Sequence, residues 1–139
     1  MEIKKYSFCQ HGDERGMLVA IEEQIDIPFD IKRVYYMYDT GENVTRGYHS
    51  HRSLEQILIC VAGSCKIILD NGEERETVML NNPYEGLYVA SNIWREMCEF
   101  SKDAVLLVLA SELYDENDYV RDYATFIEGV RRERCLEGE

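Results

Sequence analysis

The stretch that decides the fold runs from residue 46 to residue 61 and reads Arg46-Gly47-Tyr48-His49-Ser50-His51-Arg52-Ser53-Leu54-Glu55-Gln56-Ile57-Leu58-Ile59-Cys60-Val61. Its second half is an almost continuous apolar run, which is typical of a strand well inside a sheet. Because side chains alternate between the two faces of an extended segment, His49 and His51 should project to the same side. Glu55 would join them if the strand continued unbroken. We therefore expect two imidazoles and a carboxylate to share one space beside the core.

Short strand-like segments lie on both sides of the histidine pair. They are rich in β-branched, aromatic or aliphatic residues, are bounded by turn residues, and cover residues 18–22, 32–38, 56–61, 65–69, 76–80, 86–90 and 105–111. Two turn sequences, Ala62-Gly63-Ser64 and Asp70-Asn71-Gly72, predict hairpins of an antiparallel meander. The close spacing of these segments predicts an all-β barrel or sandwich.

The hydrophobic pattern changes after Ser111. Apolar and aromatic residues then recur at helical spacing, at Tyr119, Val120, Tyr123, Phe126, Ile127 and Val130. With Asn117 as a possible cap, this pattern predicts one C-terminal helix over about residues 117–132. The spacing leaves open whether that helix packs on its own barrel or on a partner chain.

Composition limits the classes of protein that fit. The 139 residues suit a single domain, 1–139, with a substantial core. Lys and Arg number 15 against 27 Asp and Glu, so the net charge of −12 argues against nucleic acid or an anionic membrane as a partner. An anionic ligand would need a local arginine cluster.

No apolar run approaches the roughly 18 to 20 residues of a spanning helix, and the first residues lack the apolar segment of a signal peptide, so we expect a cytoplasmic protein.

The five cysteines are an odd number without C-x-x-C spacing, which predicts reduced thiols rather than a disulfide framework or a zinc motif. We expect Cys60 and Cys65 to serve as small apolar core residues.

Two solvent-exposed histidines near a turn would give the same spacing. The apolar run that follows them instead indicates that His49 and His51 lie next to the core. His11 has no such context and is expected to be solvated.

The pattern His-x-His-x3-Glu, followed by a strand and a glycine at position 63, resembles the first motif of the cupin superfamily. In metal-binding cupins the resemblance implies that these three side chains ligate iron, manganese or zinc, together with a histidine from a later strand. Here Arg95 stands where that histidine would be. A guanidinium cannot ligate a metal, and its charge would oppose a nearby cation by roughly several kcal/mol. We expect no metal, although an iron site of two histidines and Glu55 stays open as an alternative.

Longer blocks, at residues 15–22, 27–36, 46–51, 86–89, 94–97 and 109–121, resemble a narrower group. These are the bacterial cupin enzymes that act as dTDP-sugar 3,4-ketoisomerases on dTDP-4-keto-6-deoxyglucose. The resemblance implies a cupin jelly-roll β-barrel and a homodimer whose N-terminal strands cross to the partner. It also implies an isomerisation without cofactor that feeds the synthesis of 3-amino-3,6-dideoxy sugars for surface polysaccharide.

The histidine pair suits that chemistry. Moving a ketone from C4 to C3 requires removal of the C3 proton, an enediol, and return of a proton to C4. A neutral imidazole, with a reference pKa of about 6.5, is a suitable base near neutral pH. The resemblance favours His51 as the first base and His49 as its partner, although spacing alone cannot rank them. The Tyr35 phenol could donate to the enolate oxygen, or it could be a core aromatic.

Arginines are the natural clamp for a nucleoside diphosphate on this acidic chain. Arg33, Arg46 and Arg121 are the candidates, with a solvated surface position as the alternative for each. The resemblance implies that the positions of Arg15 and Arg95 differ between family members giving galacto- and gluco-configured products. This chain resembles one subgroup at Arg15 and the other at Arg95, so the configuration at C4 stays open.

Three other functions fit the same sequence features. They are a metal-dependent cupin enzyme, a 3,5-epimerase of the same nucleotide sugar, and a sugar-nucleotide binding module without catalytic activity.

Overall fold

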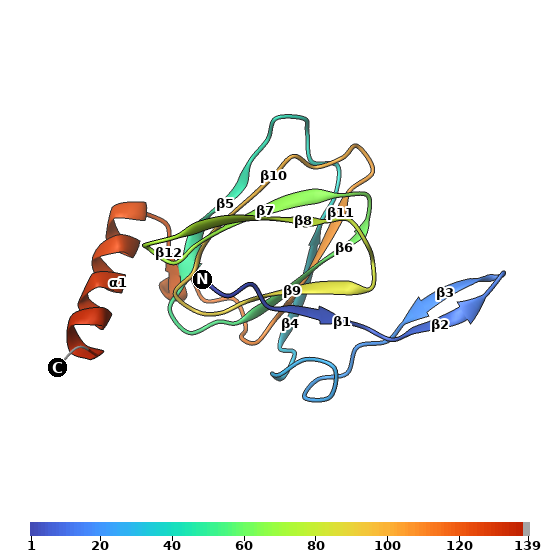
Figure 1. Ribbon diagram of the computed structural model, residues 1–139, viewed down its shortest axis with the longest axis horizontal. Helices are drawn as coiled ribbons and strands as arrows, with labels where there is room; N and C mark the ends of the chain where they lie inside the picture. Colours follow the sequence, from blue (N-terminus) through green and yellow to red (C-terminus); the bar gives the residue numbers. More distant parts are fainter. Residues whose placement is uncertain (138–139) are drawn as a thin grey trace.

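The computed structural model describes residues 1–137, whose regular elements are strands apart from one 3-10 turn and one α-helix (Figure 1). The elements in chain order are β1 (Lys5–Ser7), β2 (Gln10–Asp13), β3 (Gly16–Val19), β4 (Arg33–Met37), β5 (Arg46–His51), β6 (Gln56–Ala62), β7 (Cys65–Asp70), β8 (Arg75–Leu80), β9 (Glu85–Val89), β10 (Trp94–Cys98), β11 (Val105–Ala110), η1 (Glu116–Asp118), β12 (Tyr119–Val120) and α1 (Tyr123–Glu137). The expectation of an all-β domain with a C-terminal helix is confirmed.

Two five-stranded antiparallel sheets pack face to face. Their strand orders are β1-β9-β6-β11-β4 and β12-β5-β10-β7-β8. The sheets are not joined by hydrogen-bonded strands into a closed barrel, so the expected barrel is in detail an open sandwich. One end of the sandwich is open between the edge strands β4 and β12, and this opening holds the site described below.

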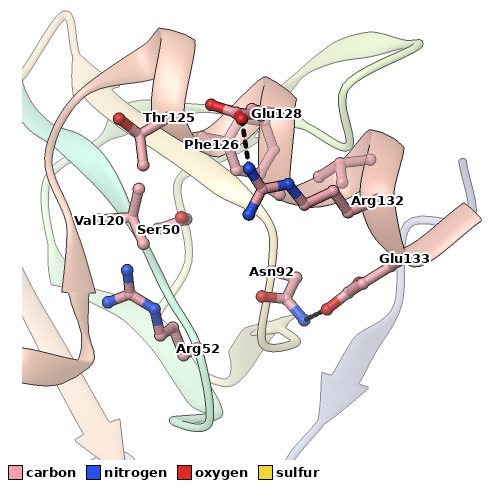
Figure 2. Close-up of a pocket in the computed structure, with 11 residues that line it drawn as sticks. Ser50, Arg52, Asn92, Val120, Thr125, Phe126, Glu128, Arg132 and Glu133 are labelled. Carbon is pink, nitrogen blue, oxygen red and sulfur yellow. Dashed lines mark hydrogen bonds and ion pairs between the residues drawn. The ribbon is translucent and has the colours of Figure 1, made fainter.

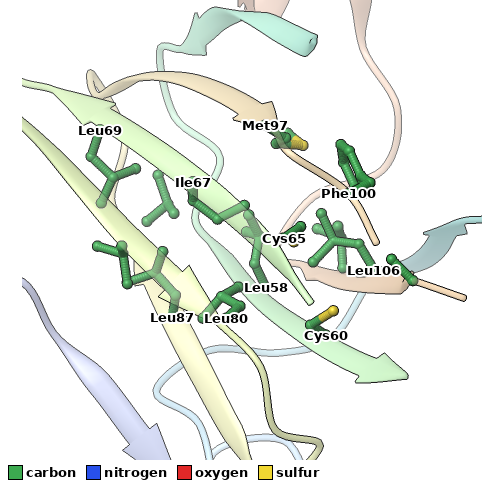
Figure 3. Packing of buried hydrophobic residues seen from close by; sticks show 14 residues of the cluster. Leu58, Cys60, Cys65, Ile67, Leu69, Leu80, Leu87, Met97, Phe100 and Leu106 are labelled. Carbon is green, nitrogen blue, oxygen red and sulfur yellow. The ribbon is translucent and has the colours of Figure 1, made fainter. Parts of the chain in front are cut away.

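Strand β6 is apolar on both faces because both faces are covered. Leu58 and Cys60 belong to the cluster between the two sheets, which Figure 3 shows. Ile57 and Ile59 belong to a second cluster on the outer face of their sheet, which the N-terminal segment covers with side chains such as Phe29. Burial of each such side chain contributes about 1.5 to 3 kcal/mol, so the apolar run fixes β6 as a central strand. Cys60 and Cys65 are core residues with free thiols, as expected.

The two predicted hairpin turns have different outcomes. Asp70-Asn71-Gly72 does connect two paired strands, β7 and β8. The hairpin prediction for Ala62-Gly63-Ser64 is wrong, because β6 and β7 lie in different sheets. Gly63 has a φ of 66°, and the Ser64 amide donates to Ser101 Oγ at 2.9 Å, so this turn carries the chain around a corner to the second sheet.

The C-terminal helix begins later than predicted. Residues 116–118 form the 3-10 turn, residues 119 and 120 pair with β5, and α1 begins at Tyr123 and ends at Glu137 rather than at 132. The Asp122 side chain accepts a hydrogen bond from the Thr125 amide at 3.0 Å and thus caps the new start. Trp94, Tyr123 and Phe126 pack together and hold α1 on its own chain. In residues 1–137 no helix is both long and apolar enough to span a bilayer.

The hairpin of β2 and β3 extends away from the two sheets, at the opposite end of the molecule from α1 (Figure 1). The strand predicted at 18–22 overlaps β3, which ends at Val19. Met17 and Leu18 of β3 are 61% and 59% exposed, and His11 of β2 is solvated as expected. Large side chains are also exposed on β4, at Val34 and Tyr36. The chain thus leaves apolar surface uncovered on this hairpin and on one edge strand.

Candidate active site

A cavity of about 290 Å³ opens at the end of the sandwich between β4 and β12. It is lined by Arg33, Tyr35, Met37, Arg46, Gly47, His49, Met97, Tyr119 and Arg121. These residues come from β4 in one sheet, from β5, β10 and β12 in the other, and from the segment after β12. The site therefore depends on the packing of both sheets and on the position of β12.

A bulge in β5 aims His49 into this opening, and His51 lines the adjoining space together with Asp118 and Tyr119. The pairing of β5 with β10 shifts register between Arg95 and Glu96, and Gly47 and Tyr48 have φ values of 94° and 56°. A Cβ on Gly47 would lie 2.9 Å from the Arg95 carbonyl oxygen, so only glycine fits without movement. The extra residue turns Tyr48 outward and His49 inward.

The His49 and His51 rings lie side by side, as predicted from their spacing. Their centroids are 4.9 Å apart with the rings nearly perpendicular, and the Tyr119 ring packs 5.0 Å from the first and 4.3 Å from the second. His49 Nδ1 lies 3.1 Å from the Gly47 carbonyl, which can only accept, so Nδ1 carries the proton. Within residues 1–137, His49 Nε2 and both His51 nitrogens are buried and make no hydrogen bond, and the Asp118 carboxylate lies 3.4 Å from His51 Nδ1. The two buried Nε2 atoms mark a place that a ligand completes.

Burial and a neighbouring cation keep both rings neutral. Burial lowers the pKa of His49 to about 4 and that of His51 to about 2, and in both cases the Arg95 charge lowers it further. At neutral pH each imidazole therefore has a free lone pair and can accept a proton.

Arg95 lies behind the histidines and has no exposed surface. Its guanidinium donates to the Gln56 side-chain oxygen and, at 2.8 Å, to the Ile93 carbonyl. Because the Gln56 oxygen accepts from Arg95, the Gln56 amide nitrogen donates to the Tyr35 hydroxyl, at 2.8 Å. That bond leaves the hydroxyl proton of Tyr35 free to donate into the cavity.

Glu55 does not join the histidines, and this expectation is wrong. Strand β5 ends at His51, and after the following turn the Glu55 carboxylate accepts a hydrogen bond from the Tyr88 hydroxyl instead. In the part of the chain that the structure describes, no three His, Cys, Asp or Glu side chains are grouped as a metal site. The alternative iron site thus lacks its carboxylate, and Arg95 places a positive charge beside the two imidazoles.

Three of the five candidate arginines line the cavity. Arg33 has two buried guanidinium nitrogens, Nε and Nη2, without a partner within residues 1–137. Arg121 lies 4.2 Å from the Tyr119 ring centroid and pairs with Glu116, and the exposed Arg46 completes the group. These side chains bring fixed positive charge to the rim of the cavity.

The other two candidate arginines do not line this cavity. Arg95 is buried beneath the histidines, as described above. Arg15 lies at the turn of the projecting hairpin, where its guanidinium pairs with Asp13 and is exposed. Within one chain, the fold thus does not bring Arg15 to the histidines.

Sequence analysis missed three site residues. Gln56 carried a signal, since a lone amide at the head of an apolar strand must find buried partners. Tyr119 was assigned to the predicted helix, and its contact with the rings follows from the pairing of Tyr119 with His51 in β12 and β5. Asp118, next to it, lies 3.4 Å from the His51 ring nitrogen. No local pattern indicates a two-residue strand.

A second hollow, of about 340 Å³, lies between α1 and β5 (Figure 2). Its polar and charged side chains already have partners: Arg132 donates to Glu128, and Asn92 donates to Glu133. Arg52 donates to the Asn117 and Tyr119 carbonyls. This hollow therefore lacks the unpartnered buried nitrogens that distinguish the cavity at the histidines.

The fold and the site together define a class of protein. An antiparallel sandwich whose open end holds two neutral imidazoles, a phenol with a free proton and several arginines is a cupin-type acid/base enzyme for an anionic substrate.

Comparisons with known proteins agree with this class. The chain matches the family described as FdtA: WxcM-like, C-terminal, over residues 1–131. It is 52% identical over 126 residues, 91% of each chain, to the TDP-4-oxo-6-deoxy-alpha-D-glucose-3,4-oxoisomerase of Aneurinibacillus thermoaerophilus. A crystal structure of a 3,4-ketoisomerase from Helicobacter canadensis has 48% identity and a TM-score of 0.91, covering 94% of this chain and 98% of that one. QdtA, a sugar 3,4-ketoisomerase from Thermoanaerobacterium thermosaccharolyticum solved in complex with TDP, has 48% identity and a TM-score of 0.92, covering 94% and 96%.

The chain belongs to this FdtA family of cupin-fold sugar 3,4-ketoisomerases, as its sequence blocks predicted. It is accordingly an isomerase.

Proposed function

We propose that the protein converts TDP-4-keto-6-deoxyglucose into a TDP-3-keto-6-deoxyhexose. The observation that carries this proposal is the set of buried, unpartnered nitrogens on two neutral imidazoles, next to a cavity rimmed with arginine. The relative from Aneurinibacillus thermoaerophilus, which is 52% identical, is named for this sugar and this shift.

The proton transfers divide between the two rings. His51 removes the proton from C3 of the sugar, and the electrons of that C–H bond form an enediolate with the C4 carbonyl. His49 moves the proton of the C3 hydroxyl to the C4 oxygen, and the C3 oxygen becomes the new carbonyl when C4 takes up a proton from His51. The free proton of Tyr35 can be donated to the oxygen that becomes negative.

The arginines support binding of the nucleoside diphosphate. Arg33 offers two unpartnered guanidinium nitrogens, and Arg46 and Arg121 lie on the same cavity wall. A diphosphate between these groups would gain charge-assisted hydrogen bonds that solvent does not replace.

We further propose a homodimer that exchanges the β2–β3 hairpin. Met17 and Leu18 on the hairpin and Val34 and Tyr36 on β4 are all more than half exposed in one chain, and β4 is an edge strand. Pairing of two chains would cover both surfaces. In such a dimer Arg15 would be carried on the hairpin to the partner's site. The free thiols of all five cysteines, which lie within residues 1–137, support a reducing compartment such as the cytoplasm.

The test is incubation of the purified protein with TDP-4-keto-6-deoxyglucose, followed by NMR of the product. We expect the ketone to move from C4 to C3, and the same spectrum reports the configuration at C4. The variant His51→Asn should still bind TDP but lose turnover.

Three results would contradict the proposal. A product that keeps its ketone at C4 with an inverted neighbouring carbon would indicate an epimerase. Binding without any product would indicate a binding module. Loss of turnover after removal of a stoichiometric metal would indicate the metal-dependent alternative.

A further inference from the structure

A carboxylate lies next to the buried ring of His51. Asp118 ends the 3-10 turn η1, and its Oδ2 is 3.4 Å from His51 Nδ1. Its Oδ1 accepts a hydrogen bond from the Ser53 amide at 2.9 Å, and Oδ2 accepts one from the Leu54 amide at 3.2 Å. The Asp118 carbonyl accepts a third from the Arg52 amide at 3.0 Å. Asp118 is thus bound to the loop that directly follows His51, so its distance from that ring is fixed by the backbone.

We propose that Asp118 is the positioning residue for His51: it holds the imidazole with its proton on Nδ1 and leaves the Nε2 lone pair free to act as the base. This inference rests on the proposed isomerisation, to which it adds the group that orients the base. Which nitrogen of a histidine carries the proton is set by the partner of the other nitrogen. Contacts of this kind are often long in the absence of substrate and shorten when the substrate is bound.

The charges around His51 show why a carboxylate is needed there. Arg95 from β10, Arg33 from β4 and Arg121 after β12 all disfavour a positive charge on the ring, and His49 is neutral. Asp118 approaches His51 with only 15% of its side chain exposed. His51 and Asp118 share the space on this side of the ring, and the other charged groups that line it are solvent-exposed; they are Lys32, Glu112 and Asp115.

Proton abstraction turns His51 into an imidazolium among these arginines. Burial and Arg95 lower the pKa of the ring to about 2 in the absence of substrate, so the imidazolium needs a closer negative charge when the substrate is bound. A carboxylate at Nδ1 stabilises the imidazolium that forms and keeps the ring in the tautomer that can form it.

The first test replaces Asp118 by asparagine. Asp118→Asn still offers an oxygen to the loop amides but has no charge, so we expect kcat to fall by about a hundredfold or more while KM changes less than about threefold. The acidic limb of the kcat–pH profile should move to lower pH, because the imidazolium that forms would have no negative charge beside it. The matched control is Asp122→Asn. Asp122 is exposed, lines neither the cavity at His49 nor the space at His51, and caps α1, where asparagine is an equally good cap, so this variant should keep wild-type kinetics.

The second test does not use activity. NMR of 15N-histidine-labelled protein, with the His51 signals assigned by comparison with His51→Asn, should show His51 protonated at Nδ1 in the wild type. In Asp118→Asn the preference for Nδ1 should weaken. A His51 ring protonated at Nε2 in the wild type would overturn the inference, even if the Asp118 variant failed to fold.

The kinetic outcome can also overturn it. An Asp118→Asn enzyme with a lower melting temperature or a raised KM, but with unchanged kcat and pH profile, would show a purely structural role. If the wild type did not isomerise the sugar while NMR still found Nδ1 protonated and dependent on Asp118, the proposed function would fail and the positioning role would stand.

Discussion

At the scale of single residues, His49 and His51 are useful because the fold keeps them uncharged. A surface histidine is partly protonated near its ordinary pKa of about 6.5 and then cannot accept a proton. Here burial next to Arg95 moves both values well below that, to about 4 and about 2. The same burial has a thermodynamic cost, because the unfolded chain can bind protons that the folded chain cannot.

That cost gives the stability of the protein a defined pH dependence. Above pH 6.5 the histidines are neutral in both states, so they do not contribute to the slope. Between pH 6.5 and about 4 the unfolded state alone binds their protons, so the free energy of unfolding should fall with acidification by about 1 kcal/mol per pH unit for each histidine. Urea unfolding between pH 7 and pH 5 measures this slope. His51→Asn should make it shallower; an equal slope in the variant and the wild type would contradict the neutral pair.

At the scale of secondary structure, the bulge of β5 decides where His49 points. Gly47 adopts a φ of 94° beneath the Arg95 carbonyl, and no other residue fits there without strain. The bulge thus links a backbone requirement to the direction of the His49 side chain, for which we propose a catalytic role.

Gly47→Ala should therefore affect both stability and activity. The added methyl group would lie 2.9 Å from the Arg95 carbonyl oxygen and would sit on a left-handed backbone, so we expect a loss of about 1 to 3 kcal/mol and a lower kcat. Chemical unfolding and the isomerase assay measure the two effects. Gly129→Ala is the matched control, since Gly129 lies in α1 with open space around it and alanine there should stabilise the protein by about 0.5 to 1 kcal/mol. Equal behaviour of the two variants would contradict the role of the bulge.

Sequence patterns predicted the strands whose interiors are mainly apolar. Strands β6 and β7 were predicted because their apolar residues alternate or run together, and β8, β9 and β11 followed in the same way. Strand β10 was missed because its interior is charged, at Arg95 and Glu96, and both side chains find partners only in the folded protein. Strand β12 and the later start of α1 depend on pairing with β5 and on the cap at Asp122.

The site was predictable where one segment builds it and unpredictable where two segments meet. The spacing of His49 and His51 was sufficient to place their rings together, because both lie in one strand. The turn after His51 removed Glu55 from the group, and that turn is held by Asp118, which is distant in sequence. Gln56 and Tyr119 also reach the site through strand pairing rather than through sequence proximity.

At the scale of the whole molecule, a single chain is incomplete in two respects. The β2–β3 hairpin and β4 expose apolar side chains, and Arg15, expected among the substrate contacts, lies on that hairpin away from its own histidines. Exchange of the hairpin between two chains would account for both features.

A complementation experiment tests the exchange. If Arg15 acts across the dimer, Arg15→Ala and His51→Asn should each have low activity as pure proteins. Mixed, unfolded and refolded together, they should regain about one quarter of wild-type activity, because half of the dimers are mixed and each has one complete site. Separate refolding of the two variants is the control. No recovery in the mixture, or full activity of Arg15→Ala alone, would contradict this role, and sedimentation of the wild type measures the dimer itself.

The chain as a whole is acidic but its cavity is rimmed with arginines, and this contrast affects the rate at which an anionic substrate associates. The net charge of −12 repels a nucleotide sugar at long range, whereas Arg33, Arg46 and Arg121 attract it only near the opening. At an ionic strength of 0.15 M the Debye length is about 8 Å, so dissolved ions screen the distant repulsion more than the attraction inside the cavity. Moderate salt should therefore speed the encounter between this acidic protein and its anionic substrate rather than slow it.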